Sequence, residues 1–234
     1  MNPFFSMLPV VVAVVVAGIA VKLNISERWR SYAQHLAAGV VFAAVAVELL
    51  PGLMRKHEIL PTIVGFAAGV ILLLGLRALE AGSSSRSEKQ ISRSYIIAIV
   101  LDLVIDGWVL GIGFAAGESQ GFLLAIALSL ELLSLSLALT SEVRAAKWSP
   151  GKAIGLIGGV SFALPLGTFL STLVIPVLPT VAFTGVLAFG VAALIYLVAE
   201  ELLVEAHEKP DTILGAGSFF IGFLAILVLD MVTR

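Results

Sequence analysis

Cysteine is absent from this chain, which excludes both a disulfide framework and a thiolate metal site. Charged residues are scarce, at 13% of the sequence against about 25% in a typical soluble domain. The net charge is −2, and no basic patch with interleaved aromatic residues is present, so we expect no nucleic-acid partner. With 59% hydrophobic residues and a mean hydropathy of +1.09, the chain is predicted to be embedded in a lipid bilayer.

Eight hydrophobic segments approach the ~20 residues that a helix needs to span a bilayer. The first lacks the basic n-region of a secretory signal, so we expect it to be retained as a span. The predicted fold class is an all-α integral membrane protein with eight transmembrane helices. A single transmembrane domain is expected over residues 1–234, with spans near 6–23, 34–54, 61–80, 94–117, 120–141, 152–175, 180–205 and 211–232.

The basic residues are distributed unevenly between the two sides of the predicted membrane. If the first loop is cytoplasmic, only Arg55, Lys56 and Arg234 lie outside. The residues on the inside are then Lys22, Arg28, Arg30, Arg77, Arg86, Lys89, Arg93, Arg144, Lys147, Lys152 and Lys209. The expected location is therefore the cell (inner or plasma) membrane, with both termini on the outer side.

Three carboxylates fall near the middle of the predicted spans. At 1.5 Å per residue, Asp102 lies about 12 Å in from Ser94, and Asp106 about 18 Å in. Glu131, entering from the opposite side, is also about 18 Å deep. Each charge at that depth costs about 2.5–3.5 kcal/mol, and these segments contain no Lys or Arg to neutralise it. Such a set is typical of a cation-binding site.

Helical spacing places Asp102 and Asp106 on one face, and Ser134 on the face of Glu131. We therefore predict a site with oxygen ligands for a hard or borderline divalent ion, formed by Asp102, Asp106, Glu131 and Ser134. Glu48 is assigned to the outer part of a transport pathway, and Glu200 and Glu201 to its inner end.

Other polar residues of the spans are interpreted as structural. Ser129, Ser136 and Thr140 are expected to be packing or back-bonding hydroxyls. Glu205, His207 and Asp230 are expected to be solvated helix ends, and His35 an interfacial or packed histidine. Pro165 predicts a kink in the sixth span. The GFAAG segments, at 65–69 and 113–117, suit either internal helix packing or a homodimer.

Three segments resemble the ZIP (Zrt/Irt-like) family of divalent metal transporters, in its short prokaryotic form. AAGVVFAAVAVELLP in the second span is similar to that family's AG…LLP pattern, and VSFALPLGT to its sixth-span motif. FGVAALIYLVAEELLVEAHE resembles the seventh-span signature. The resemblance implies eight spans in a 3+2+3 arrangement, with inverted three-helix units around a central pair.

At the family's metal site, however, this chain differs. The family's histidines in the fourth and fifth spans correspond to Asp102 and Glu131, a later glutamate to Asp106, and the sixth-span glutamate to Leu164. The resemblance therefore implies one all-oxygen site rather than a two-metal site. That donor set favours Mn²⁺ or Fe²⁺, with Zn²⁺ as a further candidate.

The predicted function is ZIP-like transport of a divalent metal cation towards the cytoplasm, with no enzymatic activity and no prosthetic group. One alternative is a non-transporting relative that senses an ion or binds a partner. Another is an intramembrane Mg²⁺-dependent lipid-modifying enzyme, but no basic residue lies between Ser94 and Val143 to hold a phosphate. The metal, the driving force and the oligomeric state are not fixed by these patterns.

Overall fold

A computed structural model describes residues 4–23, 26–82, 93–207 and 212–233. Within these ranges the backbone is helical apart from short connections, and no strand occurs. The same ranges contain eight helical spans that are long and apolar enough to cross a membrane, which confirms the predicted number. Helices suit this setting because they satisfy their own backbone hydrogen bonds where lipid offers no partner. The chain is thus a multi-pass, all-α protein.

The spans follow the predicted segments closely, although several are built from more than one helical piece. Residue 211, where the last span was predicted to begin, lies outside the described residues, as do Arg86, Lys89, Lys209 and Arg234 of the charge count. The pieces are α1 (Phe4–Lys22), α2 (Glu27–Ala44) continued by η1 (Val45–Leu49) and α3 (Leu50–Met54), α4 (Ile59–Gly82), α5 (Arg93–Ala116), α6 (Glu118–Ala145), α7 (Pro150–Ser161) with α8 (Ala163–Val174) and η2 (Ile175–Val177), α9 (Thr180–Tyr196) continued by η3 (Leu197–Leu202) and α10 (Leu203–Ala206), and α11 (Ile213–Thr233).

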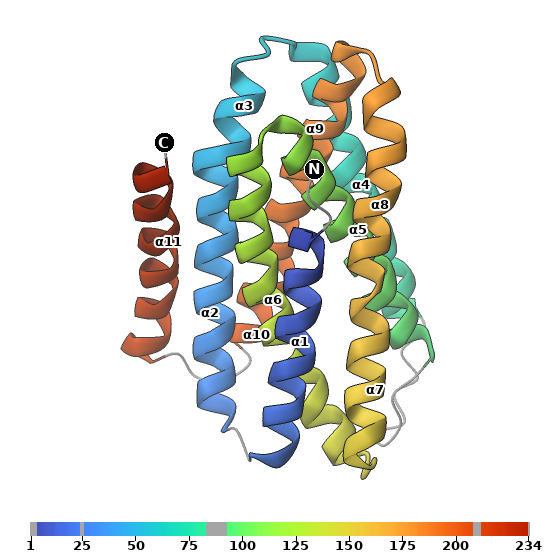
Figure 1. The fold of residues 1–234 in the computed structure, drawn as a ribbon, viewed down its shortest axis with the longest axis vertical. Helices are drawn as coiled ribbons and strands as arrows, with labels where there is room; N and C mark the ends of the chain where they lie inside the picture. Colours follow the sequence, from blue (N-terminus) through green and yellow to red (C-terminus); the bar gives the residue numbers. More distant parts are fainter. Residues whose placement is uncertain (1–3, 24–25, 83–92, 208–211, 234) are drawn as a thin grey trace.

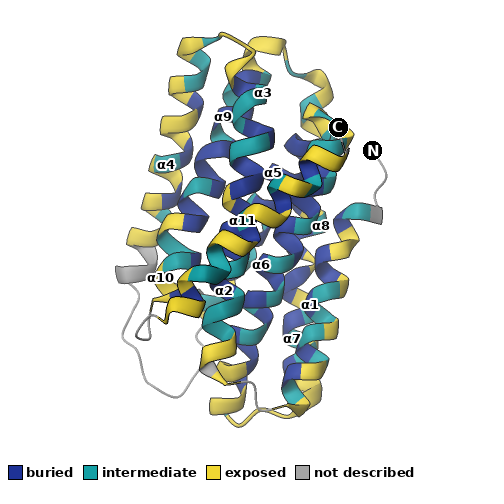
Figure 2. Cartoon of the chain, turned by 90° about the vertical axis from the view of Figure 1, so that its left-hand side faces the viewer, coloured by how far each residue is buried: buried dark blue, intermediate teal, exposed yellow. Residues whose placement is uncertain are grey.

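The helices form a bundle in which α6 is the most enclosed element. In an apolar 18-residue window of α6, 67% of the residues are buried, against 11% in the window of α4 and 22% in that of α11. Helix α4 packs along α9, and α11 packs along α2 on the outside of the bundle (Figure 1, Figure 2). Closer to the centre, α5 packs on α8 and α1 on α6, and α5 and α6 contact each other. The interior therefore centres on α5 and α6, the helices that carry the three midplane acids.

The closest helix contacts are made at glycines. A Cβ added at Gly107 of α5 would lie 1.9 Å from the carbonyl oxygen of Leu164, and one at Gly167 of α8 would lie 2.1 Å from that of Val104. The same applies to Gly65 of α4, where a Cβ would lie 1.9 Å from the carbonyl oxygen of Gly185. Small residues allow such backbone approach in membranes, where dispersion contacts hold helices together.

Three spans are interrupted part of the way along. The kink predicted at Pro165 is confirmed: α7 ends at Ser161 and α8 begins at Ala163, because proline lacks the N–H that would continue the hydrogen-bond ladder. The second and seventh spans instead contain π-helical segments, η1 and η3, which the sequence patterns did not predict. Such segments occur often at functional sites, and these two carry Glu48 in η1 and Glu200 with Glu201 in η3.

Candidate metal centre

Asp102, Asp106 and Glu131 come together in the interior, as their spacing predicted. One carboxylate oxygen from each lies within 4.8 Å of the others, an arrangement that can hold a metal ion. Asp106 and Glu131 are each 3% exposed, whereas Asp102 is only partly buried. Two acids one helical turn apart on α5 therefore face a third acid on α6.

The backbone at this point is fixed by the contact between α5 and α8. Gly107, directly after Asp106, touches the backbone of Leu164, and Leu164 itself is fully buried. The position at which the resembled family has a glutamate is thus filled by an apolar side chain within the packing. Leu103 and Leu132, which neighbour Asp102 and Glu131 in sequence, are also fully buried. The three acids consequently project from a close-packed apolar frame.

Several oxygen atoms at this centre have no hydrogen-bond partner among the described residues. They are Asp106 Oδ2, Glu131 Oε2 and Ser134 Oγ, all three buried. A buried polar atom left in this state costs about 1–3 kcal/mol, and more when it is charged. Oxygen atoms from carboxylates and a hydroxyl are the donors that Mg²⁺, Ca²⁺ and Mn²⁺ prefer. The donor set therefore fits a divalent cation.

Ser134 differs from its neighbours on α6. The hydroxyls of Ser129 and Ser136 donate to the carbonyl oxygens of Ala125 and Leu132, at 2.5 and 2.6 Å, so their predicted back-bonding is confirmed. Thr140 is buried without such a bond among the described residues. Ser134 also lacks one, and it lies one turn from Glu131, so its hydroxyl is the serine oxygen on α6 best suited to a ligand role.

A cavity of about 240 Å³ extends from Asp102 towards one end of the bundle. We call this end, which holds the α1–α2 and α6–α7 connections, the inner end (Figure 1). Glu200, Glu201 and Glu205 line the cavity with Asp102, so the structure brings the two predicted pathway acids into one space with the midplane site. Glu205, interpreted from sequence as a solvated helix end, lines the same cavity.

Sequence reasoning missed three further polar residues of this cavity: Arg77, Tyr95 and Tyr196. Arg77 of α4 forms an ion pair with Glu200, which places a positive charge beside the acids. Arg77 lies one residue before the end of the span Ile59–Ala78, where a long basic side chain reaches the interface, so its position in the sequence gave no signal of function.

Glu48 lies elsewhere. It is 2% exposed, and its Oε1 accepts a hydrogen bond from Ser119 Oγ, at 3.5 Å, beside the start of α6. Among the described residues it belongs neither to the carboxylate group nor to the lining of the inner cavity. The structure thus places Glu48 near the opposite end of α6 from the inner cavity.

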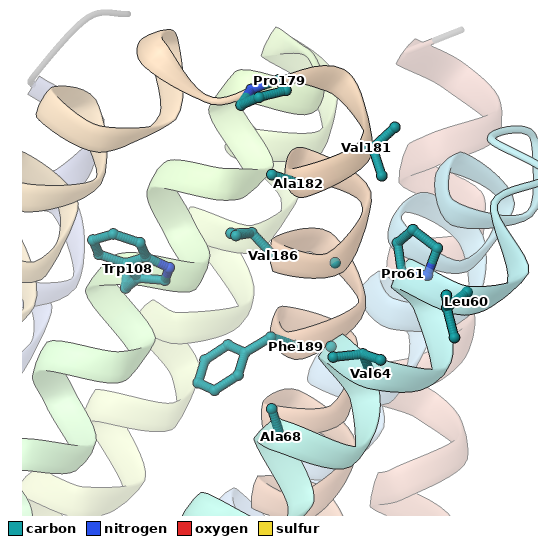
Figure 3. A pocket seen from close by; sticks show the side chains of 12 residues that line it. Leu60, Pro61, Val64, Ala68, Trp108, Pro179, Val181, Ala182, Val186 and Phe189 are labelled. Carbon is teal, nitrogen blue, oxygen red and sulfur yellow. The ribbon is translucent and has the colours of Figure 1, made fainter.

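A second hollow, of about 850 Å³, is apolar. It lies between α4 and α9, with Trp108 of α5 at one side and Leu60, Val64 and Phe189 among its other lining residues (Figure 3). Its twelve lining residues include no ionisable side chain. The chemistry that suits a cation is therefore concentrated around Asp102 and the inner cavity.

Comparison of this chain with protein-family models and with curated proteins finds no match.

Proposed function

We propose that this protein is a ZIP-like transporter that moves a divalent metal cation across the cell membrane towards the cytoplasm. The observation that carries the proposal is the group formed by Asp102, Asp106 and Glu131, in which two buried carboxylates hold oxygens without hydrogen-bond partners. Keeping three acids together in an apolar bundle is unfavourable unless protons or a cation neutralise them, and a bound cation neutralises several at once. Asp102, Asp106, Glu131 and Ser134 are the proposed ligands.

The helix pairing supports a 3+2+3 arrangement with inverted units. If α1, α2 and α4 form one unit and α7–α8, α9 and α11 the other, each unit's third helix packs on the second helix of the other unit. The first span of each unit also packs on one helix of the central pair: α1 packs on α6, and α8 packs on α5. The π-helical segments also correspond, since η1 and η3 each interrupt the second span of a unit. Such units are a common basis for alternating access to a midplane site.

The inner cavity supports the direction of transport. It connects Asp102 to Glu200, Glu201 and Glu205 at the inner end, where most basic residues gather, and the positive-inside rule assigns this end to the cytoplasm. A cation bound at Asp102 therefore has a path lined by acids in that direction. Both termini are proposed to face outward, with Glu48 on the outer part of the pathway.

The all-oxygen ligand set favours Mn²⁺ or Fe²⁺ as the transported ion, with Zn²⁺ as the third candidate. The test is to express the wild type and a variant carrying Asp102→Ala, Asp106→Ala and Glu131→Ala, and to measure cellular Mn, Fe, Co, Ni, Zn, Cd and Mg by elemental mass spectrometry. We expect one or two metals to accumulate at least several-fold with the wild type, and to return to background with the variant.

Membrane abundance of both proteins is measured in parallel, and Glu118→Gln serves as the control because Glu118 is an exposed acid on the same helix as Glu131. Equal abundance with no difference in any metal would contradict transport, and would favour the non-transporting relative.

Arg77 provides a second prediction, on the inner cavity. Arg77→Gln removes the positive charge beside Glu200, so a cation should be held more strongly there and released more slowly. We expect the half-saturating metal concentration and the maximal uptake rate both to fall, by about fivefold at most. The ion-paired side chains are 48% and 42% exposed, so the melting temperature should change little.

The matched control is Arg93→Gln, which removes an exposed charge at the start of α5. A drop in stability with unchanged uptake kinetics would mean that Arg77 only braces α4 against η3.

A further inference from the structure

The apolar hollow between α4 and α9 opens sideways, towards the surroundings of the bundle. Three of its lining side chains, Leu60, Val64 and Val181, are 71%, 59% and 51% exposed. Both helices belong to spans that are apolar enough to cross a membrane, so this side of the bundle faces lipid. A space of about 850 Å³ without an ionisable lining side chain offers little to water. The molecules that suit the hollow are therefore hydrocarbon chains of the bilayer.

The shape of the hollow also suits a chain that lies along the helices. Its lining residues on α4 run from Leu60 to Ala68, which is about 12 Å of helix. Trp108 of α5 lies at one side of the hollow, and Leu60 and Val64 lie at the other (Figure 3). Trp108 follows Asp106 by two residues, so a molecule in the hollow contacts the helix that carries two of the midplane acids.

Positive charge lies at one end of the hollow. The α3–α4 connection is at the opposite end of the bundle from the inner end, and we call this end the outer end (Figure 1). The connection carries Arg55 and Lys56, both exposed, and Lys56 precedes Leu60 by four residues. Lys56 Nζ lies 5.6 Å from the ring centre of Phe183 on α9, next to the lining residue Ala182. The aromatic face thus holds the ammonium group at the outer end of the two helices that form the hollow.

This pair of cations is confined to the mouth of the hollow. In the described part of the chain, the other connections at the outer end carry no basic residue: residue 117 precedes α6, and residues 178 and 179 precede α9. Glu58 is the one acid of the α3–α4 connection, so Arg55 and Lys56 leave that connection with a positive net charge. An anionic phospholipid presents the complementary chemistry, a negative headgroup joined to hydrocarbon chains.

From this arrangement we infer that the hollow binds an acyl chain of an anionic phospholipid, whose headgroup phosphate is held by Lys56 and Arg55. A hydrocarbon chain gains no hydrophobic stabilisation on leaving the bilayer for the hollow, because lipid tails are as apolar as the lining. Selection among lipids therefore depends on the headgroup. Each Lys or Arg near the surface favours an anionic lipid by a factor of about five, and Glu58 opposes part of that effect. Such lipid binding is independent of the proposed transport function.

The test measures how strongly brominated lipid chains quench the fluorescence of Trp108. The other two tryptophans, Trp29 and Trp148, are exposed and are removed by Trp29→Phe and Trp148→Phe. Purified full-length protein is reconstituted into vesicles of equal parts phosphatidylglycerol and phosphatidylcholine, with bromine on the chains of one lipid or the other. We expect stronger quenching when phosphatidylglycerol carries the bromine, corresponding to a preference of about fivefold or more.

Two substitutions separate the headgroup contact from the chain contact. Lys56→Gln should remove most of the preference, whereas Lys56→Arg should keep it, because arginine retains the charge and also stacks on an aromatic ring. Ala182→Phe should lower the quenching by both lipids, because it fills part of the hollow. Ala182 is an exposed lining residue, so the larger side chain does not overpack the core.

The matched control is Lys152→Gln, because Lys152 is an exposed lysine at the start of α7, at the inner end. It should leave the lipid preference unchanged. Equal quenching by the two lipids when Lys56 is present, or an unchanged preference in the Lys56→Gln variant, would overturn the inference. Weak quenching by both lipids would also overturn it, and would mean that protein, such as a second copy of this chain, covers the hollow.

Discussion

Asp106→Asn and Glu131→Gln should each abolish metal-induced stabilisation while leaving the metal-free protein at least as stable as the wild type. Both side chains are 3% exposed and lie within 4.8 Å of another acid, so each substitution removes a charge that is costly at this depth. Asparagine and glutamine keep the size and polarity of the side chains they replace. The expected rise in the metal-free melting temperature reflects relieved repulsion and desolvation.

With metal present, the wild type should have a higher melting temperature than either variant. An ion at a concentration of about 100 times its dissociation constant stabilises the folded state by about 2.7 kcal/mol, provided that it binds only that state. The wild type should therefore gain several degrees with Mn²⁺, Fe²⁺ or Zn²⁺, and the two variants should gain little. Thermal unfolding in detergent, with and without each metal, measures both effects.

Glu118→Gln provides the matched control, because Glu118 is an exposed acid at the start of the helix that carries Glu131. It should behave as the wild type in both conditions. If Asp106→Asn melts well below the wild type without metal and still responds to metal, the carboxylate is a structural group and the ligand assignment is wrong.

The second large effect is expected at the contact between α5 and α8. Gly107→Ala and Gly167→Ala each place a methyl group about 2 Å from a backbone oxygen of the facing helix, where neither partner has a flexible side chain to move away. The helices must separate, and overpacking of this kind costs about 1–3 kcal/mol or more. Because Asp106 precedes Gly107, the separation also displaces a proposed ligand. Both variants should lose most metal uptake and melt at a lower temperature.

Gly75→Ala and Gly155→Ala control for the substitution itself. A Cβ at either position has no neighbouring atom within 4 Å, and alanine favours the helix. In detergent, these variants should melt in a single transition at or above the wild-type melting temperature. If Gly107→Ala and Gly155→Ala have equal melting temperatures and equal metal uptake, α5 and α8 are not in backbone contact in the membrane.

The spans and the main carboxylate group were within reach of sequence reasoning. Hydropathy placed eight segments within a few residues of the helical spans, because each segment must satisfy its own backbone in lipid. Depth and the four-residue spacing placed Asp102 and Asp106 on one face, level with Glu131. The break at η1 is followed by Pro51 and Gly52, which could have signalled it, whereas η3 has no proline or glycine within it.

The inner end shows where such reasoning stopped. His35 and His207 were interpreted separately, as a packed residue and a solvated helix end, because they belong to different spans and no local pattern predicts that these two spans are in contact. Gln34 and Glu205 are 171 positions apart, yet they share a hydrogen bond. Arg77 was counted only as a basic residue of the inner side, although its ion pair with Glu200 places it in the cavity.

The sequence by itself determined that the chain is helical, spans a membrane many times and carries three acids near the midplane, because hydropathy and helical periodicity act over one or two turns. Only the tertiary structure decided that those acids share one centre, that a cavity joins Asp102 to Glu200 and Glu201, and that two histidines meet at the inner end. These juxtapositions depend on which helices approach one another, and local sequence patterns do not specify that; among the contacts that fix the bundle are the glycine contacts of α5 with α8 and of α4 with α9.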